Sequence, residues 1–162
     1  MAAAPRTLKE LYTADMRDLW SANDQMQKLM QPFSEKATDP KLKQLFEHSV
    51  TGIGQHTQAL RAMMDAESAS PCAGMQGLIQ EATQHALESD LPPQLRDLEL
   101  ITQYQRMSHY GVAGFGTVAA YAEALGMTEE ANKLKSIVSD IYKADEYSSH
   151  LAESAKRAAA QG

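Results

Sequence analysis

The sequence holds few of the residues that would decide its function directly. Among its 162 residues it has a single cysteine, Cys72. One cysteine excludes a disulfide within the chain and every metal motif that is built on paired cysteines. We interpret Cys72 as a small, partly buried thiol, and a disulfide to another molecule stays open as an alternative.

Long apolar runs and targeting signals are also missing. No window of the sequence approaches the roughly 18 consecutive apolar residues that a membrane-spanning helix needs. The first residues, MAAAPRT, are followed at once by the polar stretch LKELYTADMRD, which lacks the apolar segment of a signal peptide. We therefore expect a soluble, cytoplasmic protein without a membrane partner.

Positive charge is in short supply. The chain has 15 Lys and Arg against 21 Asp and Glu, which gives a formal net charge of −6. Proteins that bind nucleic acids usually cluster Lys and Arg to contact phosphates, whereas the basic residues of this chain are scattered. We expect no nucleic-acid partner.

What the sequence does contain is helical periodicity. Apolar residues recur every three or four positions in four long stretches, which is typical of amphipathic helices. Thr38 and Pro40 form a start signal for the second stretch, with the threonine as the expected cap, and Gly126 is expected to end the third. The predicted helices cover about residues 8–33, 40–63, 95–125 and 128–158.

The connections between these helices predict their arrangement. Short loops make the first two helices antiparallel neighbours, and also the last two. The connection over about residues 67–94 is long enough to cross the whole bundle and contains a short apolar-periodic piece, residues 75–87. No alternating strand pattern occurs in the sequence. We predict an all-α, ferritin-like antiparallel four-helix bundle with a short helix in its long crossover, formed by a single domain over residues 1–162, with the bundle at about 8–158.

Several short motifs carry a family resemblance. They are WSAN at 20–23, CAGMQGLI at 72–79, RD at 96–97, SHYG at 108–111, FGT at 115–117 and AEALG at 122–126. On these motifs the chain resembles the YciF-like stress proteins of the ferritin-like superfamily over about residues 8–151. The resemblance implies the same bundle, and it implies a homodimer.

The resemblance also implies where a metal centre would lie. Ferritin-like di-metal sites use inward carboxylates from all four helices, with histidines one helical turn away. The glutamates of the family align with Asn23, Gly52, Ser108 and Gly111. Without metal, a buried four-carboxylate site would keep repelling, desolvated charges at a cost of several kcal/mol per ion. We interpret the four neutral residues as former ligand positions of a degenerate di-metal site.

The third predicted helix carries three glycines near its middle, although each costs roughly 1 kcal/mol relative to alanine in a helix interior. Gly111 is one of the former ligand positions. We interpret Gly114 as a close approach between helices, and Gly116 as a glycine of the family with a packing role. The layer is expected to hold either tighter packing or a small polar cavity.

One reduced metal site is conceivable. His56 should face the core from the second helix, and Asp145 and Asp140 on the fourth helix could approach it. One histidine with one or two carboxylates could hold a single iron, manganese or zinc ion. The alternative, which is the commoner situation of an isolated buried histidine, is a neutral His56 hydrogen-bonded to Asn23, Ser108 or Asp145.

These observations lead to a first hypothesis and two alternatives. The first is a non-catalytic, YciF-like stress-response protein without a cofactor, which pairs as a homodimer through residues such as Tyr121 and Tyr147. The second is a metal-binding or redox protein with one divalent ion on His56 and Asp145. The third is a small-molecule pocket at the glycine-rich layer, which requires an apolar cavity of a few hundred Å³.

Overall fold

The computed structural model describes residues 3–65 and 70–162. Residues 1–2 and 66–69, which include the start of the predicted crossover, lie outside this part of the chain. Within it no strand occurs. The elements are α1 (Leu8–Lys36), α2 (Pro40–Ala62), α3 (Ala73–Ala82), the π-helical stretch η1 (Thr83–Glu88), α4 (Pro93–Ala124) and α5 (Thr128–Ala160).

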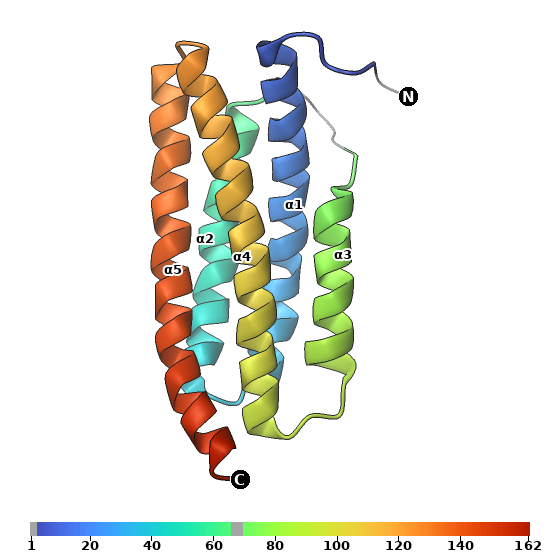
Figure 1. The fold of residues 1–162 in the computed structure, drawn as a ribbon, viewed down its shortest axis with the longest axis vertical. Coiled ribbons are helices and arrows are strands. Elements are labelled where there is room, and N and C mark those ends of the chain that lie inside the picture. The colour runs from blue at the N-terminus through green and yellow to red at the C-terminus, as the bar shows by residue number, and fades with distance from the viewer. Residues whose placement is uncertain (1–2, 66–69) are drawn as a thin grey trace.

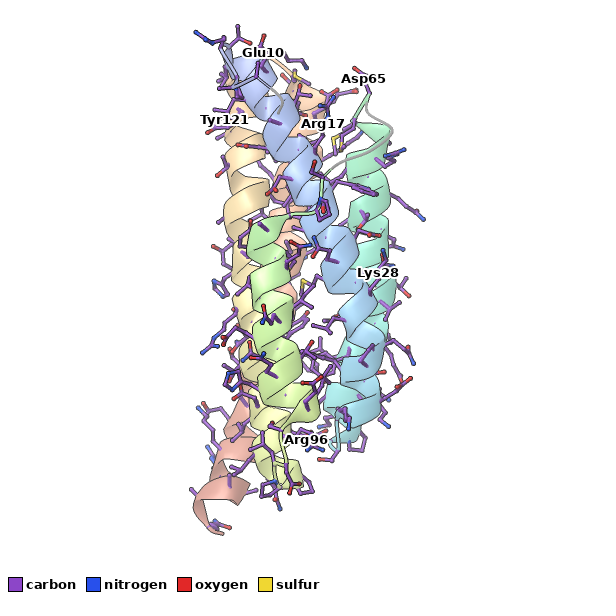
Figure 2. All side chains as sticks on the ribbon, turned by 90° about the vertical axis from the view of Figure 1, so that its right-hand side faces the viewer. Glu10, Arg17, Lys28, Asp65, Arg96 and Tyr121 are labelled. Atoms are coloured by element: carbon purple, nitrogen blue, oxygen red, sulfur yellow. The ribbon has the colours of Figure 1, made fainter. Side chains whose placement is uncertain are left out.

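Four long helices form the bundle. α1 and α2 make one antiparallel hairpin, and α4 and α5 make the other (Figure 1). The connection between the hairpins runs along the bundle, and its helix α3 packs against the outside of α1 and α4 (Figure 2). The prediction of an all-α four-helix bundle with a short helix in a long crossover is confirmed. None of the described helices is long and apolar enough to cross a membrane.

A buried carboxylate from α4 fixes the turn between α1 and α2. Asp97 is only 5% exposed and accepts hydrogen bonds from the Thr38 backbone N–H at 2.8 Å, the Thr38 hydroxyl at 2.5 Å and the Asp39 N–H at 2.9 Å. The prediction that Thr38 caps α2 is therefore wrong. Asp39 is the cap, because its Oδ1 accepts from the Lys41 N–H at 2.7 Å, and Pro40 takes the first helical position as expected.

The turn between α4 and α5 agrees with the prediction. Gly126 follows the end of α4 with a φ of +72°, a left-handed conformation that favours glycine. The Met127 N–H then donates to the Ala122 carbonyl at 2.8 Å and closes the turn.

The apolar core is divided into two clusters along the bundle. The cluster nearer the α1–α2 turn contains Phe33 and Phe46, and the cluster nearer the α4–α5 turn contains Phe115. Between them, α1 and α4 bury the polar side chains of Asn23 and Ser108. The middle level of the bundle is therefore where polar groups enter the interior, and the candidate site lies there.

Replacing the carboxylate that holds the α1–α2 turn should destabilise the whole bundle. In Asp97→Ala, the Thr38 and Asp39 N–H groups lose a buried charged acceptor, so we expect the free energy of unfolding to fall by about 2–3 kcal/mol. Urea denaturation measures this change. The control Glu47→Ala removes an exposed carboxylate from α2 and should change stability by less than about 0.5 kcal/mol. Equal stability of the two variants would contradict the anchoring role of Asp97.

Candidate site at the middle of the bundle

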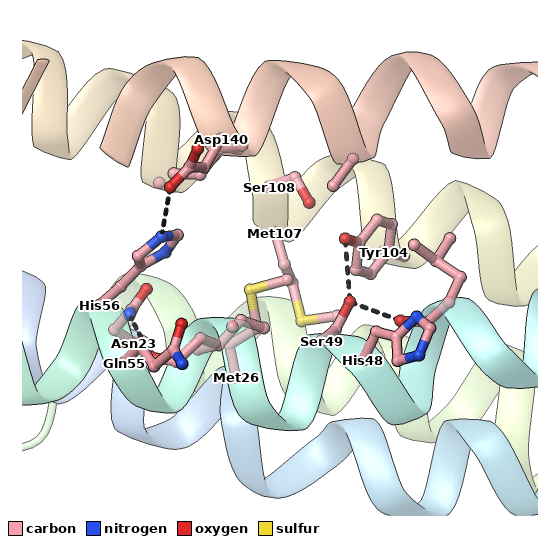
Figure 3. A pocket seen from close by; sticks show the side chains of 16 residues that line it. Asn23, Met26, His48, Ser49, Gln55, His56, Tyr104, Met107, Ser108 and Asp140 are labelled. Carbon is pink, nitrogen blue, oxygen red and sulfur yellow. Dashed lines mark hydrogen bonds and ion pairs between the residues drawn. The ribbon is translucent and has the colours of Figure 1, made fainter. Parts of the chain in front are cut away.

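A cavity of about 260 Å³ lies between α2 and α5 at the middle level, with α1 and α4 forming its floor (Figure 3). It forms at this seam because α1 packs mainly on α2 and α4 mainly on α5, while α2 and α5 make less direct contact. Two glycines widen it. A Cβ atom on Gly52 would meet no atom within 4 Å, and one on Gly111 would meet only Ile141 Cδ1, at 3.5 Å.

All four positions that the resemblance assigns to ligand glutamates line this cavity: Asn23, Gly52, Ser108 and Gly111. The Asn23 side chain is 7% exposed, and its Nδ2 donates to the Ile53 carbonyl at 3.3 Å and to the Thr57 hydroxyl at 3.2 Å. This neutral amide thus ties α1 to α2. No formal negative charge is present at any of the four positions.

His56 faces the cavity as expected, and its partner is Asp140. The two side chains meet across the mouth, with 3.2 Å between His56 Nε2 and Asp140 Oδ2. The His56 side chain is 17% exposed and the Asp140 side chain 53%. On its inner side the imidazole stands edge-on to the Phe115 ring, with 6.2 Å between centroids. The pair therefore links α2 to α5 at a half-open site.

The structure separates Asp145 from His56. Asp145 Oδ2 lies 3.2 Å from His109 Nε2, and Asp145 Oδ1 is buried without a hydrogen-bond partner among the described residues. The reason is helical phase, because side chains five positions apart on a helix point roughly 140° apart. Asp140 and Asp145 consequently face different neighbours. The contact between His109 and Asp145 joins α4 to α5.

The donor set at this level is small. Among the described residues, no three His, Cys, Asp or Glu side chains converge closely enough to hold a metal ion. The cavity has the His56–Asp140 pair, with the exposed His48 elsewhere on its rim. A ferritin-like pair of ions would need a carboxylate from each of the four helices and two histidines. The residues present do not fit such a pair.

A second polar group lies at the other end of the cavity, and the sequence analysis missed it. Ser49 Oγ donates to the Leu45 carbonyl at 2.8 Å and lies 3.2 Å from the hydroxyl of Tyr104. Burial raises the pKa of the Tyr104 phenol above its ordinary value, while hydrogen bonds with Ser49 and Ser108 oppose this shift. Tyr104 therefore presents a neutral hydroxyl to the cavity. The available signal was the spacing of Tyr104, Ser108 and Gly111 along one helix face.

The other two glycines of α4 have different environments. A Cβ on Gly114 would lie 2.7 Å from Leu19 Cδ1 on α1, so the predicted close approach between helices is confirmed. Gly116 is exposed, and a Cβ there would meet no atom within 4 Å. The predicted packing role of Gly116 is therefore wrong, because its α-carbon faces away from the core.

Cys72 lies in a separate polar cluster at the start of α3. Its thiol is 1% exposed, 3.3 Å from Asp18 Oδ2 and 3.1 Å from the Tyr110 hydroxyl. Its backbone N–H donates to Ser21 Oγ at 2.9 Å. The thiol is more deeply buried than the partly buried group that was predicted, and this burial protects it from disulfide exchange in the folded state.

Comparison with known proteins assigns the family. A model described as a domain of unknown function, DUF892, matches residues 7–161. The chain belongs to this family. Protein YciF of Escherichia coli (strain K12) is 28% identical over 135 residues, which cover 80% of this chain and 81% of the relative. The resemblance drawn from the motifs is thereby confirmed.

Solved structures agree. The crystal structure of the E. coli stress protein YciF matches this DUF892 chain with a TM-score of 0.88 at 25% identity, covering 94% of this chain and 99% of the other. YcfI from Rhodopseudomonas palustris matches with a TM-score of 0.85 at 24% identity, covering 92% and 97%. This DUF892 member thus has the same ferritin-like bundle as relatives whose structures have been solved.

In this DUF892 chain, the raised pKa of Tyr110 should make the free energy of unfolding fall at high pH. The hydrogen bond to Cys72 raises the pKa of the Tyr110 phenol, and burial and the charges of Cys72 and Asp18 raise it further. The unfolded chain ionises its tyrosines near pH 10, so this stabilisation is present below about pH 10 and is lost as pH rises toward the folded pKa.

We expect the free energy of unfolding of Tyr110→Phe to fall less steeply than that of the parent between about pH 9 and pH 11. Urea denaturation at several pH values provides the measurement. Tyr142→Phe, which changes a tyrosine that is 50% exposed, is the control and should follow the parent. Parallel curves for all three proteins would contradict the assignment.

Proposed function

We propose that this protein is a non-catalytic stress-response protein that uses the ferritin-like bundle as a scaffold, its di-metal site being degenerate. Its relative in E. coli is described as a stress protein and aligns with most of the chain. The observation that carries the proposal is that Asn23, Gly52, Ser108 and Gly111, the four positions that the resemblance assigns to ligand glutamates, line one cavity and carry no charge.

The chemistry of this lining supports the proposal. Two divalent ions in a protein interior need carboxylates to offset their charge, and iron and manganese prefer oxygen and imidazole ligands. Asn23 is already engaged with α2, and the glycines offer no side chain. Asp140 is the only carboxylate among the described lining residues, and it is half-exposed and paired with His56.

Metal content tests the proposal directly. The purified protein is dialysed against iron(II), manganese(II) or zinc, freed of excess ion, and analysed for its elements. We expect no stoichiometric metal from a lining of this chemistry. Two ions per chain would overturn the proposal and would restore ferritin-like redox chemistry as the leading hypothesis.

Restoring carboxylates should restore metal binding. In Gly52→Glu/Gly111→Glu, two new carboxylates would join His56 and Asp140 around the cavity. We expect manganese(II) to raise the melting temperature of this variant by about 5 °C, because an ion bound only by the folded state stabilises it. Gly77→Glu/Gly116→Glu adds the same charges at exposed positions and should not respond. A similar response from the parent protein would argue against a degenerate site.

A mononuclear site is the second candidate, and the His56–Asp140 contact favours it. Asp145, the partner expected from the sequence, is engaged with His109 instead. Two protein ligands fall short of the three or more that zinc sites use, so such a site would be weak. This candidate predicts one ion per chain that His56→Ala releases, and the same elemental analysis distinguishes it.

The homodimer stays a prediction. Of the two tyrosines expected at its interface, Tyr147 is 44% exposed on α5, whereas Tyr121 is half-buried against the apolar cluster that contains Phe115. Light scattering on the eluting protein would give its mass in solution and decide between monomer and dimer.

A further inference from the structure

The cavity at the middle level has the size and make-up of a site for a small organic molecule. Its volume of about 260 Å³ compares with about 30 Å³ for one water in the liquid. Pockets for drug-sized ligands begin near 300 Å³ and combine apolar walls with a few polar groups. The cavity therefore suits a compact molecule that is smaller than a typical drug.

The walls favour an aromatic body. Met26 from α1 and Met107 from α4 are 5% and 0% exposed, and their side chains lie together in the floor of the cavity (Figure 3). Ile53 and Ile141 line it from α2 and α5. Methionine side chains are flexible and polarisable, and their sulfur atoms make favourable contacts with aromatic rings. A flat ring that lies over the two methionines would use both properties.

The two ends of the cavity differ in charge. The mouth carries the Asp140 carboxylate beside His56, and the far end carries the buried hydroxyls of Ser49, Tyr104 and Ser108. No Lys or Arg occurs among the described residues that line the cavity. An anionic ligand would meet Asp140 without a fixed cation to offset the repulsion, whereas an amine at the mouth would pair with it. The hydroxyls at the far end can exchange hydrogen bonds with a neutral polar group.

We propose that this cavity binds a small aromatic amine that also carries a hydroxyl group. The amine lies at Asp140, the ring lies over Met26 and Met107 in the floor of the cavity, and the hydroxyl group reaches Ser108 and Tyr104. The proposal rests on the proposed function, because a pair of metal ions at this level would occupy the same space.

Tyramine is the probe that matches these requirements, and 4-hydroxyphenylacetate is its anionic counterpart. Protein stripped with chelator and dialysed is titrated with each compound in a calorimeter, and its metal content is measured in the same preparation. We expect tyramine to bind with a dissociation constant on the order of 100 µM. The anion should bind at least about 10-fold more weakly, because it places a second carboxylate near Asp140.

Variants that fill the cavity test whether the ligand binds there. Gly52→Leu and Gly111→Leu introduce side chains into the space from two different helices, and each should weaken tyramine binding at least about 10-fold. Gly116→Leu makes the same change at an exposed position of α4 and should bind like the parent. Asp140→Asn should weaken tyramine about 3-fold and leave the uncharged 4-ethylphenol unchanged, as expected for a half-exposed ion pair.

The outcomes separate this inference from the proposed function. Folded, metal-free protein without saturable tyramine binding would overturn the ligand site and leave the proposed function standing. Two ions per chain in protein dialysed against iron(II), manganese(II) or zinc would overturn both. Unchanged binding in Gly111→Leu and Gly52→Leu would put tyramine outside the cavity and so overturn the site. Equal or tighter binding of the anion would overturn the assignment of an amine ligand.

Discussion

The two apolar clusters set the distances between the four long helices. They thereby also set how much space remains between the helices at the middle level. In one cluster Phe33, Phe46 and Tyr104 pack edge-to-face, with ring centroids 5.3 and 5.5 Å apart. Burial of such rings is among the largest stabilising terms in a small bundle. Because packing on both sides holds the helices, missing side chains at Gly52 and Gly111 leave space that the bundle cannot close completely.

The side chains at the middle level therefore affect stability more through their charge than through their packing. Carboxylates held in this interior would need metal ions or would remain desolvated and mutually repelling. Asn23 needs no metal ion, because its neutral amide donates hydrogen bonds to the Ile53 carbonyl and the Thr57 hydroxyl. These bonds join α1 to α2 without a counter-ion. Under the proposed function, the chain keeps the fold of its family while the chemistry of the middle level differs, because one fold can host several functions.

Features that depend on local sequence pattern, such as the helices and one turn, could be predicted from the sequence. Contacts between side chains of different helices could not, because they depend on how each helix is rotated about its axis. Apolar periodicity located the four helices, and Gly126 marked the end of α4. Thr38 was misassigned as a cap because its partner, Asp97, lies 59 residues away. The choice between Asp140 and Asp145 as partner of His56, and the meeting of Ser49 with Tyr104, depend on how whole helices turn toward one another.

The position of the cavity also determines how it can open. α2 and α5 belong to different hairpins, and they make less direct contact than the pairs α1–α2 and α4–α5. The link across their seam at the mouth is the His56–Asp140 pair, whose carboxylate is half-exposed. An exposed pair of this kind contributes at most about 1 kcal/mol. Residues of α2 and α5 take part in both apolar clusters, so separating whole helices would expose those clusters. Displacing only the two side chains of the pair costs far less, and the mouth is therefore the natural route by which a small molecule reaches the interior.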